Sequence, residues 1–116
     1  KTTNDPRWPG HKLIENTYII FTSDNGGMEG HPGEIITDNY PLDRGKISAM
    51  EGGTRVPLII TGPGIKKGIE SDVVVNGLDF YPTLLTLTGT PQPKQKNLDG
   101  SDLSELLLRD PTNPDL

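Results

Sequence analysis

Glycine and proline, 14 and 11 of the 116 residues, divide this chain into short segments. Glycine weakens a helix, proline breaks one, and the chain holds a single alanine, so the sequence excludes long helices that are stable by themselves. The apolar residues lie in short runs between turn-forming residues. The composition therefore predicts a folded chain that is rich in loops.

Charge and residue content exclude several classes of function. The net charge of −5 at pH 7 argues against a nucleic-acid partner and against adsorption to an anionic membrane surface. Without cysteine, the chain cannot form a disulfide, a zinc–thiolate site or a cysteine nucleophile. No apolar run approaches the roughly 18 residues of a membrane span. The chain begins with Lys1 rather than Met, so we expect it to be processed or cut from a longer protein.

Three apolar runs predict strands. Residues 17–22 form a continuous β-branched and aromatic run, which is typical of a strand covered on both faces, as in an α/β sheet. A second run covers residues 56–61, and a shorter one covers 72–75. Between the first two, residues 26–45 hold five glycines and predict one long loop, of a length that is usually functional or disordered.

Two helices follow. Asp79 is a plausible N-cap of the first, Pro82 falls in its first turn and Gly89 ends it. Its core-facing stripe is predicted to comprise Leu78, Tyr81, Leu84, Leu85 and Leu87. The second is predicted over residues 103–109, capped by Ser101 or Asp102, with Leu103, Leu106 and Leu107 on its apolar face.

This order of elements is typical of a fragment of an α/β architecture. We expect an irregular arm over residues 1–12, a partial α/β domain over 13–109 and a polar tail over 110–116. Ligands of open α/β sheets bind beyond the carboxyl ends of strands, where Asp24 and Asn25 follow the first strand.

Asp24 and Asn25 offer a carboxylate and an amide oxygen, which suit Ca²⁺ or Mg²⁺, although Asp-Asn-Gly is also a common turn sequence. Lys46, after Gly45, can present a compact positive charge to a tetrahedral oxyanion, or be a solvated surface lysine. His31 is a candidate general acid or substrate contact, or an ordinary loop histidine.

Glu51 and Arg55 flank Gly52-Gly53 just before the second strand. The two side chains can pair there and fix the entry into the strand, a role that is structural rather than catalytic.

Five segments, in chain order, resemble segments of the sulfatase family. They are residues 15–27, similar to its strand and metal-ligand segment; 39–46, its loop with a sulfate-contacting lysine; 51–57, its E-G-G-x-R-V-P stretch; 78–85 with Gly89, its D-[LF]-x-P-T-L-L helix; and 98–101, its L-D-G-x-[SD] segment. Each motif alone is weak, but five in the right order form a specific signal.

The resemblance implies an alkaline-phosphatase-like α/β fold that hydrolyses sulfate esters, of small molecules or of glycans, with a formylglycine nucleophile. It implies that Asp24 and Asn25 are the last two ligands of one divalent cation, Ca²⁺ or alternatively Mg²⁺, and that Lys46 contacts the sulfate oxygens. The cation and the lysine would neutralise charge as the S–O bond breaks. The family also implies a periplasmic or secreted location, or a lysosomal one in a eukaryote.

The chain departs from the family in two ways. The usual Leu-Arg-Gly-Gly-Lys-Gly is Leu42-Asp43-Arg44-Gly45-Lys46-Ile47 here, so the lysine keeps its place, the arginine is displaced by one and the glycine after the lysine is lost. The C/S-x-P-S/A-R motif that yields formylglycine, and the other two aspartate ligands, are absent from these residues.

We therefore expect a piece from the C-terminal half of a sulfatase catalytic domain. Alone, it should not turn over a sulfate ester, and it should bind a cation weakly or not at all. It should also self-associate, because cutting a sheet exposes apolar strand faces and edges.

Two other functions remain open from the sequence. One is a phosphonate or phosphate monoester hydrolase of the same superfamily, which shares the E-G-G-x-R-V-P and G-K motifs. The other is a non-catalytic structural module that keeps the fold, which the altered loop at residues 43–47 would allow.

Overall fold

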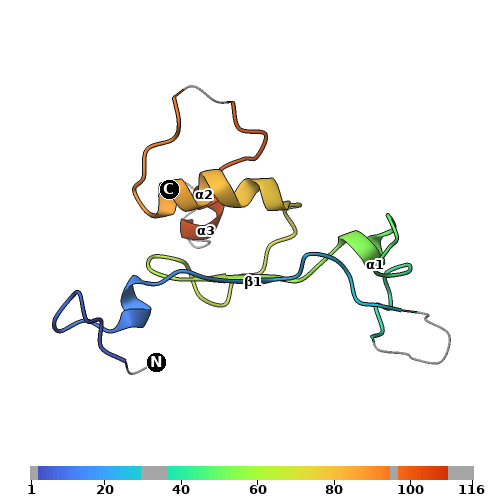
Figure 1. Ribbon diagram of the computed structural model, residues 1–116, viewed down its shortest axis with the longest axis horizontal. Coiled ribbons are helices and arrows are strands. Elements are labelled where there is room, and N and C mark those ends of the chain that lie inside the picture. Colours follow the sequence, from blue (N-terminus) through green and yellow to red (C-terminus); the bar gives the residue numbers. More distant parts are fainter. Residues whose placement is uncertain (1–2, 30–36, 95–96, 110–116) are drawn as a thin grey trace. The chain divides into compact units, whose positions relative to one another are not determined.

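The computed structural model describes residues 3–29, 37–94 and 97–109 (Figure 1). The chain divides into two compact units, Lys1–Pro63 and Gly64–Leu116. The first unit contains the 3₁₀ helix η1 (Leu13–Asn16), strand β1 (Ile19–Thr22), the one-turn helix α1 (Glu51–Thr54) and strand β2 (Leu58–Thr61). The second contains the 3₁₀ helix η2 (Gly77–Asp79) and helices α2 (Phe80–Leu87) and α3 (Ser104–Leu108).

Residues 3–16 form a closed turn that leads into β1. Asn4 and Lys12 form a β-bridge across it, and the side chain of Asp5 is buried inside it. One carboxylate oxygen of Asp5 accepts a 2.9 Å hydrogen bond from the backbone N–H of Arg7. That hydrogen bond is the main cause that lowers the pKa of Asp5.

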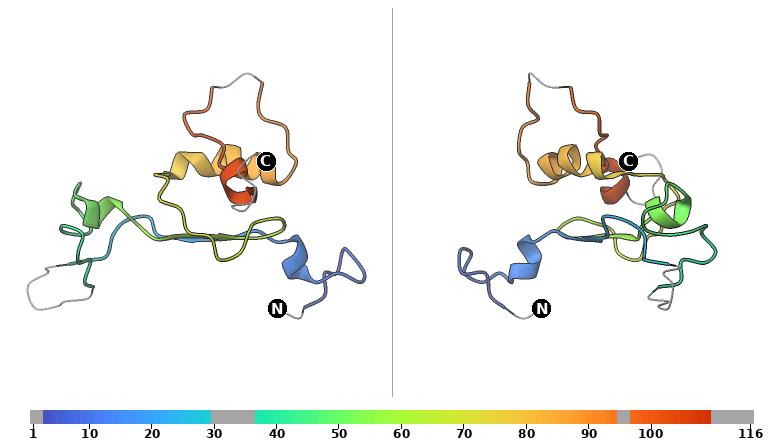
Figure 2. Two further views of the ribbon diagram at one scale, coloured as in Figure 1. Left: turned by 180° about the vertical axis from the view of Figure 1, so that it is seen from behind. Right: turned by 45° about the vertical axis from the view of Figure 1, so that its right-hand side comes forward.

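β1 and β2 pair antiparallel, with Ile19 opposite Thr61 and Thr22 opposite Leu58, and lie side by side in both views of Figure 2. Both predicted strands are confirmed in position, although they are shorter than the apolar runs. The prediction that the first strand is covered on both faces is wrong for the described chain. Phe21 and its register partner Ile59 are 61% and 60% exposed, and no other helix or strand among the described residues of the first unit packs against this sheet.

The prediction of a third strand at residues 72–75 is wrong. These residues have no strand structure, and Val74 is 95% exposed. A strand needs a neighbour that receives its backbone hydrogen bonds, and none of the described segments pairs with it.

The second unit is held by a polar latch, which we define as the side chains of Asp79 and Thr83 with their backbone partners. The carboxylate of Asp79 accepts 2.8 Å hydrogen bonds from the N–H groups of Asn76 and Ser101. The hydroxyl of Thr83 donates to the carbonyl of Asp79 at 2.6 Å and accepts from the N–H of Leu103 at 2.9 Å. Both side chains are buried, so the latch fixes the residues before α3 against the start of α2.

The helix predictions are confirmed with shorter bounds. Gly89 follows α2 with a φ of +67°, the left-handed conformation that ends helices. Asp79 stands at the N-cap but makes no side-chain cap bond there, because its carboxylate belongs to the latch. The predicted stripe is correct only in part. Leu84, Leu85 and Leu87 are half-buried, whereas Leu78 and Tyr81 are exposed; the buried residues of α2 are Pro82 and Thr83.

α3 packs against α2, with Leu103 buried and Leu106 and Leu107 half-buried, as expected. The N-cap of α3 is Leu103, which makes no side-chain cap bond, so the predicted cap at Ser101 or Asp102 is wrong in position. The carboxylate of Asp102 still accepts a 2.8 Å hydrogen bond from the N–H of Ser104, the first residue of the helix. None of the helices in the described residues is long and apolar enough to cross a membrane. A two-stranded sheet with short helices is consistent with a fragment of an α/β architecture.

Candidate functional site

Three backbone segments meet at a cluster of glycines in the first unit, which we call the glycine junction: Gly26, Gly27, Gly45, Gly52 and Gly53. The segments are joined by three backbone hydrogen bonds of 2.9 Å, from Gly26 N–H to Gly53 O, from Lys46 N–H to Gly27 O and from Gly52 N–H to Asp43 O. The chain therefore folds back on itself largely through direct contacts between backbone segments.

The approach is so close that side chains are excluded. A Cβ at Gly26 would lie 1.6 Å from the carbonyl oxygen of Gly52, and one at Gly52 would lie 1.7 Å from that of Arg44. A Cβ at Gly45 would lie 2.2 Å from the carbonyl oxygen of Gly27. Gly26, Gly45, Gly52 and Gly53 are thus required by contact with backbone, whereas a Cβ at Gly27 would meet the side chain of Thr37.

The junction brings two of the predicted site segments together. Lys46 is bonded through its N–H to Gly27, two residues after Asn25. The side chains of Asp24 and Lys46 are exposed and make no hydrogen bond or ion pair with another described residue. His31 lies outside the described residues.

Asn39 is a residue that the sequence argument did not single out. Its half-buried side-chain amide nitrogen donates to the carbonyl oxygens of Gly27 at 3.0 Å and Arg44 at 3.1 Å, and lies 3.4 Å from a carboxylate oxygen of Glu29. One amide thus connects the segment after Asn25 with the segment before Lys46. The only signal for Asn39 in the sequence is its position at the start of the segment that resembles the lysine loop.

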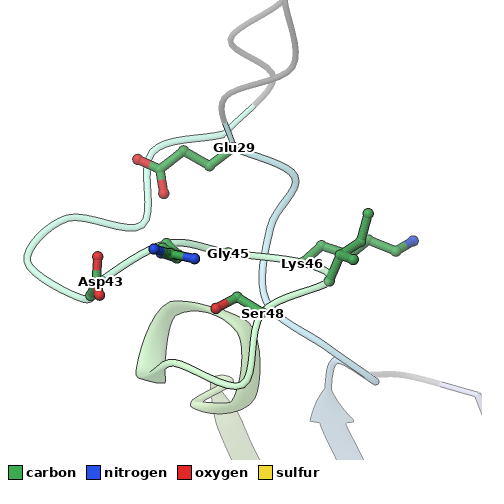
Figure 3. A pocket seen from close by; sticks show the side chains of 7 residues that line it. Glu29, Asp43, Gly45, Lys46 and Ser48 are labelled. Atoms are coloured by element: carbon green, nitrogen blue, oxygen red, sulfur yellow. The ribbon is translucent and has the colours of Figure 1, made fainter.

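A cavity of about 500 Å³ opens on this loop (Figure 3). Its lining residues are Glu29, Asp43, Arg44, Gly45, Lys46, Ile47 and Ser48. In Figure 3 the Lys46 amine extends away from the carboxylates of Glu29 and Asp43. The volume is in the range of small-molecule sites, about 300–1,000 Å³.

The backbone around Lys46 is left-handed at two residues that are not glycine. Arg44 has a φ of 60° and Ile47 a φ of 77°, and Ile47 is 91% exposed. When Lys46 is aligned with the lysine of the pattern Leu-Arg-Gly-Gly-Lys-Gly, both residues stand where that pattern has glycine. The loop thus keeps a glycine-type path with side chains that disfavour it, at a cost of about 1–2 kcal/mol per residue.

The donors at Asp24 and Asn25 fit part of a hard-cation site. Both offer oxygen, which Ca²⁺ and Mg²⁺ prefer, but Ca²⁺ takes about 6–8 oxygens. Within residues 3–29, 37–94 and 97–109, no three His, Cys, Asp or Glu side chains gather as ligands. The two residues can thus supply a share of a coordination shell and no more.

Glu51 and Arg55 form the predicted pair, with Nη1 and Oε2 3.5 Å apart. Both side chains are more than two-thirds exposed, at 68% and 69%. Such exposed i,i+4 pairs stabilise a helix by about 0.3–0.5 kcal/mol, so this pair contributes little to the entry into β2.

Comparison with known proteins identifies the family. The model of the sulfatase family matches residues 11–90. A sulfatase of Formosa agariphila is 40% identical over 110 residues, which is 89% of this chain and 19% of that protein. Arylsulfatase K of Danio rerio is 36% identical over 96 residues, 83% of this chain and 16% of that protein.

The extracellular sulfatase SULF-1 homolog of Drosophila melanogaster is 37% identical over 95 residues, 82% of this chain and 8% of that protein. The chain spans less than a fifth of each of these relatives. Both the extent of the family match and the level of identity support one conclusion: this chain belongs to the sulfatase family.

Proposed function

We propose that this chain contributes part of the active site of an enzyme that hydrolyses sulfate esters, of small molecules or of glycans. The observation that carries the proposal is the hydrogen bond from Lys46 N–H to Gly27 O, which joins the lysine loop to the segment of Asp24 and Asn25. In this proposal the two units belong to an alkaline-phosphatase-like fold. We further expect a periplasmic, secreted or lysosomal location.

In this proposal the charge of each residue determines its role. Lys46 has an exposed ammonium with no partner among the described residues, so it is available to bind the sulfate oxygens and to stabilise the charge that they carry as the S–O bond breaks. Asp24 and Asn25 would hold a divalent cation, Ca²⁺ or Mg²⁺, together with ligands from elsewhere. When bound, that cation supplies further positive charge to the sulfate. The glycine junction holds the two segments at a fixed separation.

The nucleophile is assigned to residues other than these 116, because a C/S-x-P-S/A-R motif does not occur among them. The family resemblance makes it a formylglycine. The chain alone is therefore expected to be inactive, and turnover of an aryl sulfate by the purified 116 residues would contradict this.

Lys46→Ala and Asp24→Ala, in a polypeptide of family length that contains these residues, test the proposal. Each should lower kcat/KM for an aryl sulfate by about 10²–10³-fold, as loss of one charge-stabilising group does. Lys67→Ala removes the same charge from an exposed lysine of the other unit and should leave activity unchanged. Loss of stability without loss of activity would favour a non-catalytic module. Preference for phosphate or phosphonate monoesters would favour the other hydrolase class.

We also propose that the isolated chain self-associates through the exposed pair Phe21 and Ile59 on the β1–β2 sheet. Adjacent apolar side chains on an open two-stranded sheet favour pairing with another copy. Light scattering of the 116 residues should show a mass that rises with concentration, and Phe21→Ser should reduce the rise. A monomer at high concentration would contradict the proposal.

A further inference from the structure

Arg44 is a cation in the cavity beside Lys46 that the proposed reaction does not use. Its side chain is exposed and makes no ion pair or hydrogen bond with another residue in the described part of the chain. This holds although Asp43 and Glu29 line the same cavity. The side-chain partner of Glu29 is instead the amide of Asn39, at 3.4 Å.

The backbone of Arg44 is fixed in a conformation that arginine disfavours. Its φ is 60°, its carbonyl oxygen accepts a 3.1 Å hydrogen bond from Asn39, and the Cα of Gly52 approaches the same oxygen so closely that a Cβ would lie 1.7 Å away. Glycine would satisfy all of these contacts without strain. The side chain therefore adds nothing that the backbone needs, and strain of this kind is typical of functional sites.

We propose that Arg44 is a specificity residue that binds a second anionic group, a carboxylate or a second sulfate, on the sulfate ester whose reacting sulfate is bound by Lys46. The inference rests on the proposed function and deepens it by naming the substrate class. A guanidinium binds either anion through two parallel hydrogen bonds, whereas the ammonium of Lys46 acts as a point charge. Two unpaired cations two residues apart in one cavity match a substrate with two negative groups better than one with a single sulfate.

The substrate-selectivity ratio tests this in a polypeptide of family length that contains these residues. The probes are an aryl sulfate with a ring carboxylate, an aryl disulfate and, as the reference, the neutral carboxamide analogue. Arg44→Gly should reduce the ratio of kcat/KM for at least one dianionic probe over the reference by about 10- to 100-fold, as expected for loss of a hydrogen-bonded charge pair. The probe whose ratio falls more identifies the second anion.

Ile47→Gly is the matched control, because it relieves the same type of backbone strain at the residue directly after Lys46 without removing a charge. It should leave the selectivity ratio unchanged, and Arg44→Lys should restore part of it. Equal ratios in the parent and in Arg44→Gly, with turnover of all probes, would overturn the inference and leave the proposed function standing. Absence of turnover of every sulfate ester by the unsubstituted polypeptide would overturn the proposed function, and the inference with it.

Discussion

The backbone N–H of Lys46 lies 2.9 Å from the carbonyl oxygen of Gly27. This contact joins residues that are 19 positions apart in the sequence and that come from two different motifs. It exists only because the glycine junction lets three backbone segments approach one another more closely than any side chain allows. The position of the lysine relative to Asp24 and Asn25 is thus set by backbone geometry, and it should respond to small changes in these glycines.

Gly26→Ala tests this directly. The added Cβ would lie 1.6 Å from the carbonyl oxygen of Gly52, a contact that only a backbone shift can relieve. We expect a loss of at least about 1–3 kcal/mol in the free energy of unfolding, measured by urea denaturation of a polypeptide of family length. Gly77→Ala is the control, because a Cβ there meets no atom within 4 Å. If Gly26→Ala lowered the free energy of unfolding no more than Gly77→Ala does, the three segments would not approach one another this closely.

Asn39 should prove to be a positioning residue. Asn39→Ala leaves the carbonyls of Gly27 and Arg44 without their side-chain donor, and we expect a loss of about 0.5–1.5 kcal/mol in stability and faster exchange of the Lys46 amide hydrogen. Asn39→Asp should reduce stability more than Asn39→Ala does, because it brings a negatively charged carboxylate against two carbonyl oxygens. Equal stability of the Asp variant and the parent would contradict this role.

Replacing the two left-handed residues with glycine should stabilise the loop. Ile47→Gly removes the strain at a φ of 77°, and the gain exceeds the entropy that glycine costs in the unfolded chain, for a net of about 0.5–1 kcal/mol. Val74→Gly is a matched control, since Val74 is β-branched and 95% exposed but has no positive φ. It should destabilise. If thermal unfolding showed that both substitutions shift the melting temperature in the same direction, the strain at Ile47 would be disproved.

The polar latch predicts acid sensitivity in the second unit. Hydrogen bonds from the N–H groups of Ser101, first, and Asn76 lower the pKa of Asp79 from its ordinary value of 3.8. Because the folded pKa lies below the unfolded one, the stabilisation is present above about pH 4 and is lost as the pH falls through the lowered value. Asp79→Asn should reduce the free energy of unfolding at neutral pH, and it should make the loss of stability at acid pH (the acid limb of the stability–pH curve) smaller than in the parent. Asp72→Asn, at an exposed carboxylate outside the latch, should leave that limb intact.

Sequence patterns located the main elements because they depend on local signals. The apolar runs placed β1 and β2, Pro82 marked the first turn of α2 and Gly89 marked its end. Residues 72–75 show where such signals fail. A run of valines favours a strand, but a strand forms only beside a partner, and no local pattern reports whether one is present.

The site was predictable in its segments and not in its contacts. Motifs pointed to Lys46, Asp24 and Asn25 as site residues, and their roles stay predictions. Asn39 could not be predicted in the same way, because a polar residue in a loop belongs to no periodic pattern. Its role is to donate hydrogen bonds to two carbonyl oxygens, which only the folded chain brings close to it. The left-handed backbone at Arg44 could not be predicted either. A glycine at this position would have indicated a positive φ, whereas an arginine does not.

Cation binding by the isolated 116 residues should be weak. Asp24 and Asn25 offer two donors, whereas Ca²⁺ takes about 6–8, so we expect a Kd weaker than about 1 mM in titration calorimetry. Asp24→Ala should then give the same heat trace as the parent chain. Tight binding that this substitution abolishes would mean that the chain completes the shell with other groups, and the view of these residues as a partial cation site would have to be abandoned. In a polypeptide of family length, the same substitution should instead weaken Ca²⁺ affinity strongly, because there it removes one ligand from a full shell.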